Sequence, residues 1–246
     1  MSMPNEPIPL CVAEPTTFWP WLPWADFSRL PDKDEVLVIV PIAGFADWGL
    51  GRPFDAEETV LMPVLAEAVR RRSEKVRLLV VPPLRFVAGP GPRTAFAVDA
   101  PTAIAFINEV CASVKEAGFR RIVLFNASPW NEEIVDAAAR DLRIERNLQM
   151  FCVNLSALGL DFRPDRAKSR ANLQALLTSL LGREPEGTSN LIGSTTPASD
   201  ALPAQAVPDG TTVLVDASIH LASLLEEIAA RPPLARGGAL IPMMTP

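Results

Sequence analysis

Short apolar runs that alternate with amphipathic segments constrain the fold of this chain more than any other feature. Residues 36–41 read Val-Leu-Val-Ile-Val-Pro, and similar runs follow at 76–81, 121–126 and 150–155. Runs of this length with few polar positions are typical of strands covered on both faces. Segments with apolar residues at helical spacing follow them, at 55–72, 101–117, 131–143 and 165–181. The alternation predicts an α/β fold, with a mostly parallel central sheet flanked by helices on both faces.

The ends of these segments carry the residues that helix termini favour. Gly118 and Gly182 each follow a predicted helix, as C-terminal caps do. Toward the C-terminus we expect a last strand over 211–216 and a last helix over 219–230. We expect a single domain over 1–246, with an irregular, proline-rich arm at 1–34 and a long loop at 184–210.

The composition excludes several classes of function. The chain is 48% apolar, its formal net charge is −6, and no basic stripe is visible, so nucleic acid is not an expected partner. No apolar run approaches the length of a membrane span. The first ten residues hold three prolines and no cationic start, so we expect a cytoplasmic protein. One histidine, His220, and three scattered cysteines exclude histidine-rich zinc chemistry.

In open parallel sheets, ligands bind beyond the C-terminal ends of the strands. The loops to consider are therefore 42–58, 83–99, 126–133 and 156–170. Residues 41–58 read Pro-Ile-Ala-Gly-Phe-Ala-Asp-Trp-Gly-Leu-Gly-Arg-Pro-Phe-Asp-Ala-Glu-Glu. Residues 118–131 read Gly-Phe-Arg-Arg-Ile-Val-Leu-Phe-Asn-Ala-Ser-Pro-Trp-Asn.

Over roughly residues 18–182, these two stretches and their order resemble the creatininase (creatinine amidohydrolase) family. The resemblance implies an α/β protein with a dinuclear zinc or manganese site. It implies hydrolysis of cyclic amides, formamides or related C–N bonds, and assembly into oligomers, commonly hexamers.

Carried over position by position, the family's metal ligands are mostly lost. The first-loop glutamate falls on Ala46 and its histidine on Trp48, and the aspartate falls on Glu57. In the later loop, Ser128 and Trp130 stand at ligand positions, while the flanking Asn126 and Asn131 survive. Arg166 and Arg170 stand where a further ligand segment is expected. The resemblance therefore implies that the metal site is lost, and we expect no cofactor.

Each candidate residue also has a structural explanation. Trp48 and Trp130 are either walls for a small ring-shaped ligand or fillers of the space that a metal site left. Arg166 and Arg170 lie on one helical face and either favour an anionic ligand or form a solvated surface. The acids could form a hard-cation site, although a helix start explains several of them; they are Asp47, Asp55, Glu57, Glu58 and Asp99. His220 is expected to be a packed or surface residue.

These observations lead to two main hypotheses about function. The first is a pseudoenzyme that has lost its dinuclear site and assembles with itself or with a catalytically intact paralogue. The second is a divergent amidohydrolase that binds a small molecule and uses Glu57 or Asp55 to activate water. Its ligand-binding residues would be Trp48, Arg52, Asn126, Ser128, Trp130, Asn131, Arg166 and Arg170. A weaker third possibility is a sensor that binds a small molecule without turnover.

Overall fold

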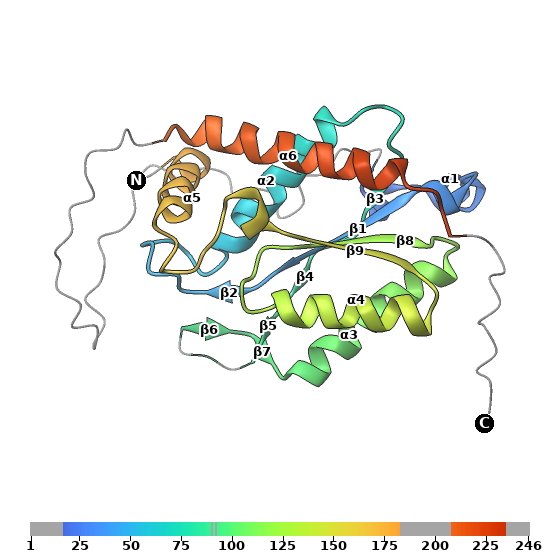
Figure 1. The fold of residues 1–246 in the computed structure, drawn as a ribbon, viewed down its shortest axis with the longest axis horizontal. Coiled ribbons are helices and arrows are strands. Elements are labelled where there is room, and N and C mark those ends of the chain that lie inside the picture. The colour runs from blue at the N-terminus through green and yellow to red at the C-terminus, as the bar shows by residue number, and fades with distance from the viewer. Residues whose placement is uncertain (1–16, 90, 92, 183–207, 235–246) are drawn as a thin grey trace, which may run out of the picture.

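A computed structural model describes residues 17–89, 91, 93–182 and 208–234 (Figure 1). Its centre is a parallel sheet in the order β3-β1-β8-β9. These strands are β3 (Leu78–Val80), β1 (Leu37–Ala43), β8 (Arg121–Asn126) and β9 (Gln149–Asn154). A short strand, β4 (Leu84–Arg85), pairs with β1 beyond the end of β3. The predicted mostly parallel sheet is confirmed.

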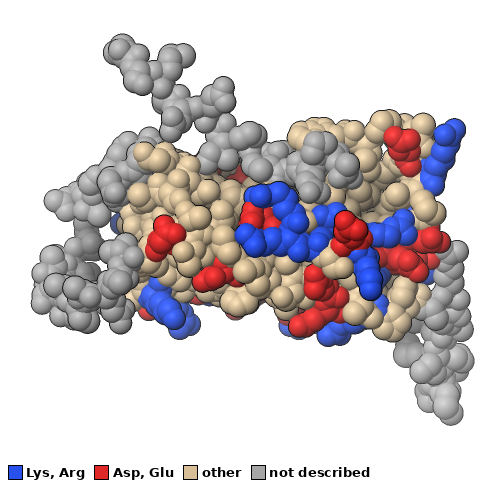
Figure 2. Space-filling view, turned by 90° about the horizontal axis from the view of Figure 1, so that it is seen from above, with Lys and Arg blue, Asp and Glu red and all other residues tan. Residues whose placement is uncertain are grey.

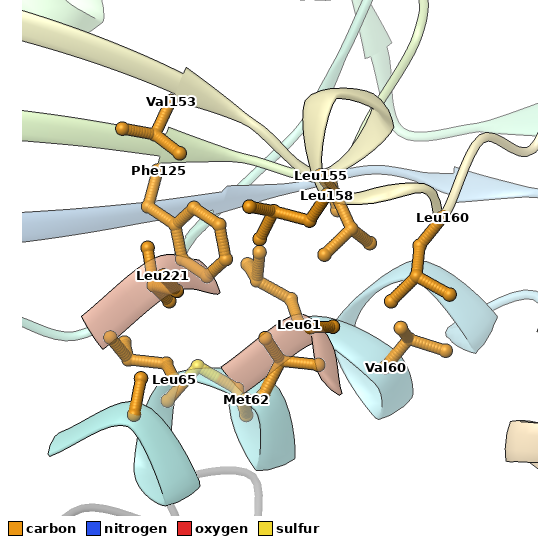
Figure 3. Packing of buried hydrophobic residues seen from close by; sticks show 14 of the residues in the cluster. Val60, Leu61, Met62, Leu65, Phe125, Val153, Leu155, Leu158, Leu160 and Leu221 are labelled. Atoms are coloured by element: carbon orange, nitrogen blue, oxygen red, sulfur yellow. The ribbon is translucent and has the colours of Figure 1, made fainter. Parts of the chain in front are cut away.

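Helices cover both faces of this sheet, as predicted. One face holds α2 (Ala56–Arg71), α5 (Ala167–Leu181) and α6 (Gly210–Ala230), and the other holds α3 (Ala100–Glu116) and α4 (Glu132–Glu145). In Figure 3, Leu61 and Leu65 of α2 and Leu221 of α6 meet Phe125 and Val153 of the sheet. The short helix η3 (Leu155–Leu158), which follows β9, packs into the same cluster.

The C-terminal prediction is wrong in one part. Residues 211–216 are not a strand, because one continuous helix, α6, runs from Gly210 to Ala230. The Asp209 side chain accepts a hydrogen bond from the Thr212 N–H and caps the helix start. Val213, Ala217 and Leu221 are buried at helical spacing, so packing against α2 and α5 outweighs the β-branched run at 211–215.

The described part of the N-terminal arm is more regular than predicted. It contains η1 (Trp19–Trp21), α1 (Trp24–Arg29) and η2 (Lys33–Glu35). Trp19 packs against Phe27 and Phe119, so aromatic contacts hold the arm on the α3 side of the sheet. Residues 1–16 of the predicted arm and most of the predicted 184–210 loop lie outside the described residues.

A proline occupies the central strand where its neighbour is interrupted. Pro41 lacks an N–H and faces the break between β3 and β4. Ile39 pairs with Val80, but Ile42 pairs with Leu84, so three steps on β1 face four on the partner. This bulge changes the direction of the side chains, because Leu78 faces the α2 side whereas Leu84 faces the α3 side.

The predicted loop after the second strand contains further short pairings. Besides β4 it holds β5 (Val87–Ala88), β6 (Thr94–Ala95) and β7 (Ala97–Val98). β6 pairs with β2 (Phe45–Ala46), which directly follows β1, and β5 pairs with β7. These pairings fix the first two strand-end loops against each other.

The face of the molecule seen in Figure 2 carries charges of both signs, in agreement with the absence of a basic stripe in the sequence. Figure 2 shows acidic and basic side chains next to one another, beside a wide uncharged area, on the described part of the face seen from above. None of the described helices is both long and apolar enough to cross a membrane.

Candidate functional site

The strand ends converge on one buried carboxyl group. Glu57 lies in the first turn of α2, and its side chain has 0% exposure. The backbone N–H of Gly44, at the end of β1, donates to its Oε2 at 2.6 Å, and the indole Nε1–H of Trp48 donates to its Oε1 at 3.0 Å. Both carboxyl oxygens therefore accept hydrogen bonds from the 42–58 loop.

Burial is the largest influence on the pKa of the Glu57 carboxyl group. Loss of hydration raises the pKa of Glu57 from 4.5 to about 7, and the hydrogen bonds from Gly44 and Trp48 and the neighbouring Ser128 hydroxyl oppose the rise. No cationic side chain is among the causes. Glu57 is thus a carboxyl group that exchanges its proton near neutral pH.

Gly44 permits the close approach of backbone to carboxylate. A Cβ at this position would lie 2.6 Å from Val87 Cγ2, 3.1 Å from Glu57 Oε2 and 3.2 Å from Ser128 Oγ. Those distances also place the Ser128 hydroxyl beside the carboxyl group, although it meets the geometry of a hydrogen bond with no described group. Ser128 is fully buried at the end of β8.

Aromatic rings close the site toward solvent. The rings of Trp48 and Trp130 stack with centroids 6.1 Å apart and planes at 23°, and Trp48 also contacts Phe162 at 5.5 Å. Trp130 is 49% exposed, so it forms the outer layer, and Trp48 is half-buried beneath it. Arg170 donates to the Trp48 carbonyl at 3.1 Å and fixes the loop from the α5 side.

The two asparagines of the loop after β8, Asn126 and Asn131, make hydrogen bonds mainly to backbone groups. The amide of Asn126 donates to the Ser128 carbonyl and to Asn154 Oδ1. Asn131 accepts from the Ala88 N–H and donates to the Phe86 carbonyl. Both are buried, so they hold the strand-end loops in place and do not face an open space.

Other predicted site residues lie elsewhere. Arg166 is largely exposed and pairs with Asp161 and Asp165, so it does not share a space with Arg170. Arg52 donates to Thr178 Oγ1 at 2.6 Å. Asp55 directly precedes α2, where an aspartate often caps a helix, but its side chain makes no capping hydrogen bond.

The remaining acids do not form a cation site. Glu58 makes a two-bond ion pair with Arg85, Asp99 caps α3, and Asp47 accepts from the Gly49 N–H. Among the described residues, no group of three or more His, Cys, Asp or Glu side chains could hold a metal ion. His220 is exposed on α6, as expected for a surface residue.

The sequence reasoning missed a polar cluster at the rim. Arg163 pairs with Glu132 and with Asp161, and Ser156 Oγ donates to Glu132 Oε1. These residues come from three separate segments after β8 and β9, and no local spacing connects them. Phe162, which supports Trp48, was missed for the same reason.

Comparison with known proteins places the fold in a family. The model of the family described as Creatininase: Creatinine amidohydrolase matches residues 21–181. A putative creatinine amidohydrolase from Bacteroides fragilis is similar in structure, with 15% identity, 82% of this chain and 92% of that chain covered, and a TM-score of 0.59. No curated protein sequence matches the chain.

Two further solved structures give the same result. A creatinine amidohydrolase (creatininase) has 15% identity, covers 88% of this chain and 99% of its own, and has a TM-score of 0.62. A creatininase described with Mn has 15% identity, coverages of 87% and 99%, and a TM-score of 0.62. The family match over 21–181, together with this shared fold, shows that the chain belongs to the creatininase family.

Proposed function

We propose that this chain is a non-catalytic member of the creatininase family, which acts by assembling with itself or with a catalytically intact paralogue. The observation that carries the proposal is the Trp48 indole N–H on the Glu57 carboxyl group. A neutral donor occupies the position where the family places a metal ligand.

The residues present do not fit a dinuclear metal centre. Ala46, Trp48 and Trp130 offer no electron pair suited to a divalent ion, and the Ser128 hydroxyl is a weak ligand when neutral. Among the described residues Glu57 belongs to no group of three or more possible ligand side chains, and N–H donors already bond both its oxygens. One carboxylate cannot hold two cations, so we derive no reaction step through metal.

Metal analysis tests this proposal directly. The full chain, purified from cells grown with added zinc and manganese, is expected to contain far less than one ion per chain by mass spectrometry. It is also expected not to hydrolyse creatinine, lactams or formamides. A creatininase with intact ligands, purified in parallel, is the positive control. About two ions per chain, or turnover that requires metal, would overturn the proposal.

A divergent amidohydrolase is the second candidate, and the proton affinity of Glu57 favours it. A carboxyl group with a pKa of about 7 can accept a proton from water at neutral pH. The Trp48 side chain would first have to move away from the carboxyl group, because both carboxyl oxygens accept hydrogen bonds from N–H groups. The Asn126 and Ser128 region would then line the opened space.

A ligand screen separates the two candidates. Thermal shifts with lactams, formamides and carboxylates would identify binding, and product formation would identify turnover. Turnover that is lost in Glu57→Gln would favour the hydrolase. Binding that is lost in Trp48→Ala, without any turnover, would favour a binding pocket in a non-catalytic protein.

A further inference from the structure

No strand of the described residues covers the outer edge of the sheet at β9. Within the described residues β9 pairs only with β8. The Gln149 N–H donates to the Arg120 carbonyl, so Gln149, Phe151 and Val153 direct their backbone groups toward β8. Met150, Cys152 and Asn154 consequently direct theirs outward.

Most of these outward groups lack partners in the described part of the chain. The Met150 carbonyl accepts from the Arg143 guanidinium at 2.8 and 3.0 Å, which confirms its direction. No described group bonds the outward backbone groups of Cys152. An unpaired six-residue edge is a template for an added strand, and natural proteins usually protect such edges.

The charges beside this edge form an ordered row. Two acids followed by two bases recur at helical spacing along one side of α4: Glu132, Asp136, Arg140 and Arg143. Glu132 meets Ser156 beyond the end of β9, and Arg143 meets Met150 near its start. The basic end of the row therefore lies near the start of β9 and the acidic end near its last residue.

The centre of the row lies at Cys152. The Cys152 thiol donates to the Val135 carbonyl at 3.8 Å, and Val135 directly precedes Asp136 in α4. This contact, with the bonds of Arg143 to Met150 and of Ser156 to Glu132 on either side, places the middle of the row beside Cys152. Asp136 and Arg140 also pair with each other across one helical turn and are both substantially exposed.

We infer that the open edge of β9 pairs in antiparallel fashion, about a twofold axis at Cys152, with β9 of a second copy of this chain. In this register Cys152 faces its symmetry mate, and Met150 faces Asn154 of the other copy. The outward N–H and C=O groups of Cys152 then bond those of the second copy's Cys152, the Met150 carbonyl keeps its bonds to Arg143, and the two sheets become continuous. The interface is isologous, because the same surface serves both copies.

The charge row selects this occupant and this direction. A twofold axis at Cys152 places the acidic half of one row opposite the basic half of the other, so Asp136 faces the second copy's Arg140 position. A parallel or strongly shifted pairing would place like charges together, which is unfavourable. The row is self-complementary, which points to a second copy and not to an unrelated strand.

Charge reversals test this interface, which rests on the assembly part of the proposed function. By sedimentation velocity, the unaltered full chain should dimerise, whereas Asp136→Arg and Arg140→Asp should each shift it to monomer, with a dissociation constant raised at least tenfold. A one-to-one mixture of the two variants should form heterodimers, because opposite charges again face each other. The double variant D136R/R140D should dimerise by itself.

A control on the same helix distinguishes this effect from a general loss of charge. Asp141→Arg lies on the flank of α4 that faces away from β9, and it should leave the dimer unchanged. A dimer that ignores both reversals, or a mixture that stays monomeric, would overturn the β9 interface. The first of these results leaves assembly through another surface, and so the proposed function, intact. A wild-type chain that is monomeric at high concentration and with an intact paralogue present would overturn both.

Discussion

At the residue scale, the indole N–H of Trp48 occupies the place of a cation without supplying its charge. A full positive charge beside Glu57 would hold the pKa of its carboxyl group below 4.5. The partial charges of two N–H groups offset only part of the lost hydration, and the pKa therefore remains at about 7. The proton affinity of Glu57 thus reflects burial beside neutral donors.

Glu57→Gln should change how stability depends on pH. Glu57 holds its proton more tightly in the folded state than in the unfolded state, so its contribution is complete below pH 4.5 and is lost as pH rises toward 7. The loss for the wild type relative to the variant should be about 3 kcal/mol, from ~1.4 kcal/mol for each unit. Urea unfolding at pH 4.5 to 8 measures it.

The slope of unfolding free energy against pH is compared, because replacing Glu57 by glutamine also changes stability in a way that does not depend on pH. The glutamine NH2 would face one N–H donor and lower stability by an amount independent of pH, so the slope is the readout. Glu133→Gln, at an exposed position on α4, controls for the loss of one carboxyl group. Equal slopes for wild type and Glu57→Gln would contradict the raised pKa.

Trp48→Phe removes the N–H donor but keeps an aromatic ring against Trp130 and Phe162. The pKa of Glu57 should rise further, because one of the bonds that lowers it is gone. The free energy of unfolding should fall by about 1 kcal/mol, the typical contribution of one hydrogen bond. Trp130→Phe, which keeps the bond to Glu57, should cost less in the same urea titration; a larger loss there would argue against the bond.

Part of this site could be predicted from the sequence. Position-by-position carry-over placed Trp48, Glu57, Ser128 and Trp130 together, and the structure brings these four into one corner. Their contacts could not be predicted, because the bond from Trp48 to Glu57 depends on the path of the eight residues between them. Whether any of these residues binds a ligand stays a prediction.

At the element scale, local pattern predicted the four strands of the central sheet well, but it predicted a fifth strand where α6 begins. β8 has the predicted bounds, because a six-residue run buried on both faces has few alternatives. Residues 211–215 carry a strand-like β-branched run, yet they join α6. The deciding contacts are with α2 and α5, which are distant in sequence, so no local pattern shows them.

Arg121 links the start of β8 to the end of α6. Its guanidinium is buried and donates to the Ile228 carbonyl at 2.5 Å, in the last turn of the helix, and to the Arg231 carbonyl at 3.0 Å, just after it. Burial lowers the pKa of this side chain. Arginine suits this position because one planar group can serve several carbonyls.

Arg121→Met should therefore destabilise the fold by about 3 kcal/mol, since it leaves buried carbonyls without donors. Protection of the α6 amides from hydrogen exchange should fall first near 228. Arg120→Met, at the neighbouring and more exposed position, is the matched control. Equal losses for the two variants would show that the link to α6 is not specific.

At the scale of the whole molecule, two apolar clusters on opposite faces of the sheet hold the fold. One lies under α2, α5 and α6, and the other under α3 and α4. The strand-end site adds one buried carboxyl group and no ion-binding set among the described residues. We therefore expect that a bound metal ion contributes nothing to the stability of this fold.

Chelation should accordingly leave the fold unchanged. Because a ligand stabilises only a protein that binds it, the midpoint of thermal unfolding should shift by less than about 1 °C with excess EDTA. An intact creatininase measured in parallel shows whether the chelator removes a family metal under these conditions. A large drop in the midpoint for this chain would contradict the proposed loss of the metal site.

The extra residue between β3 and β4 gives the length of this connection a tolerance of one residue. Deleting Pro82 alone would leave three steps opposite the three on β1, so Leu84 could keep its place opposite Ile42 and still face α3 in an uninterrupted strand. Removing both Pro82 and Pro83 would leave two steps opposite three and would turn Leu84 toward α2. Over evolution, this stretch is therefore expected to lose one residue more readily than two.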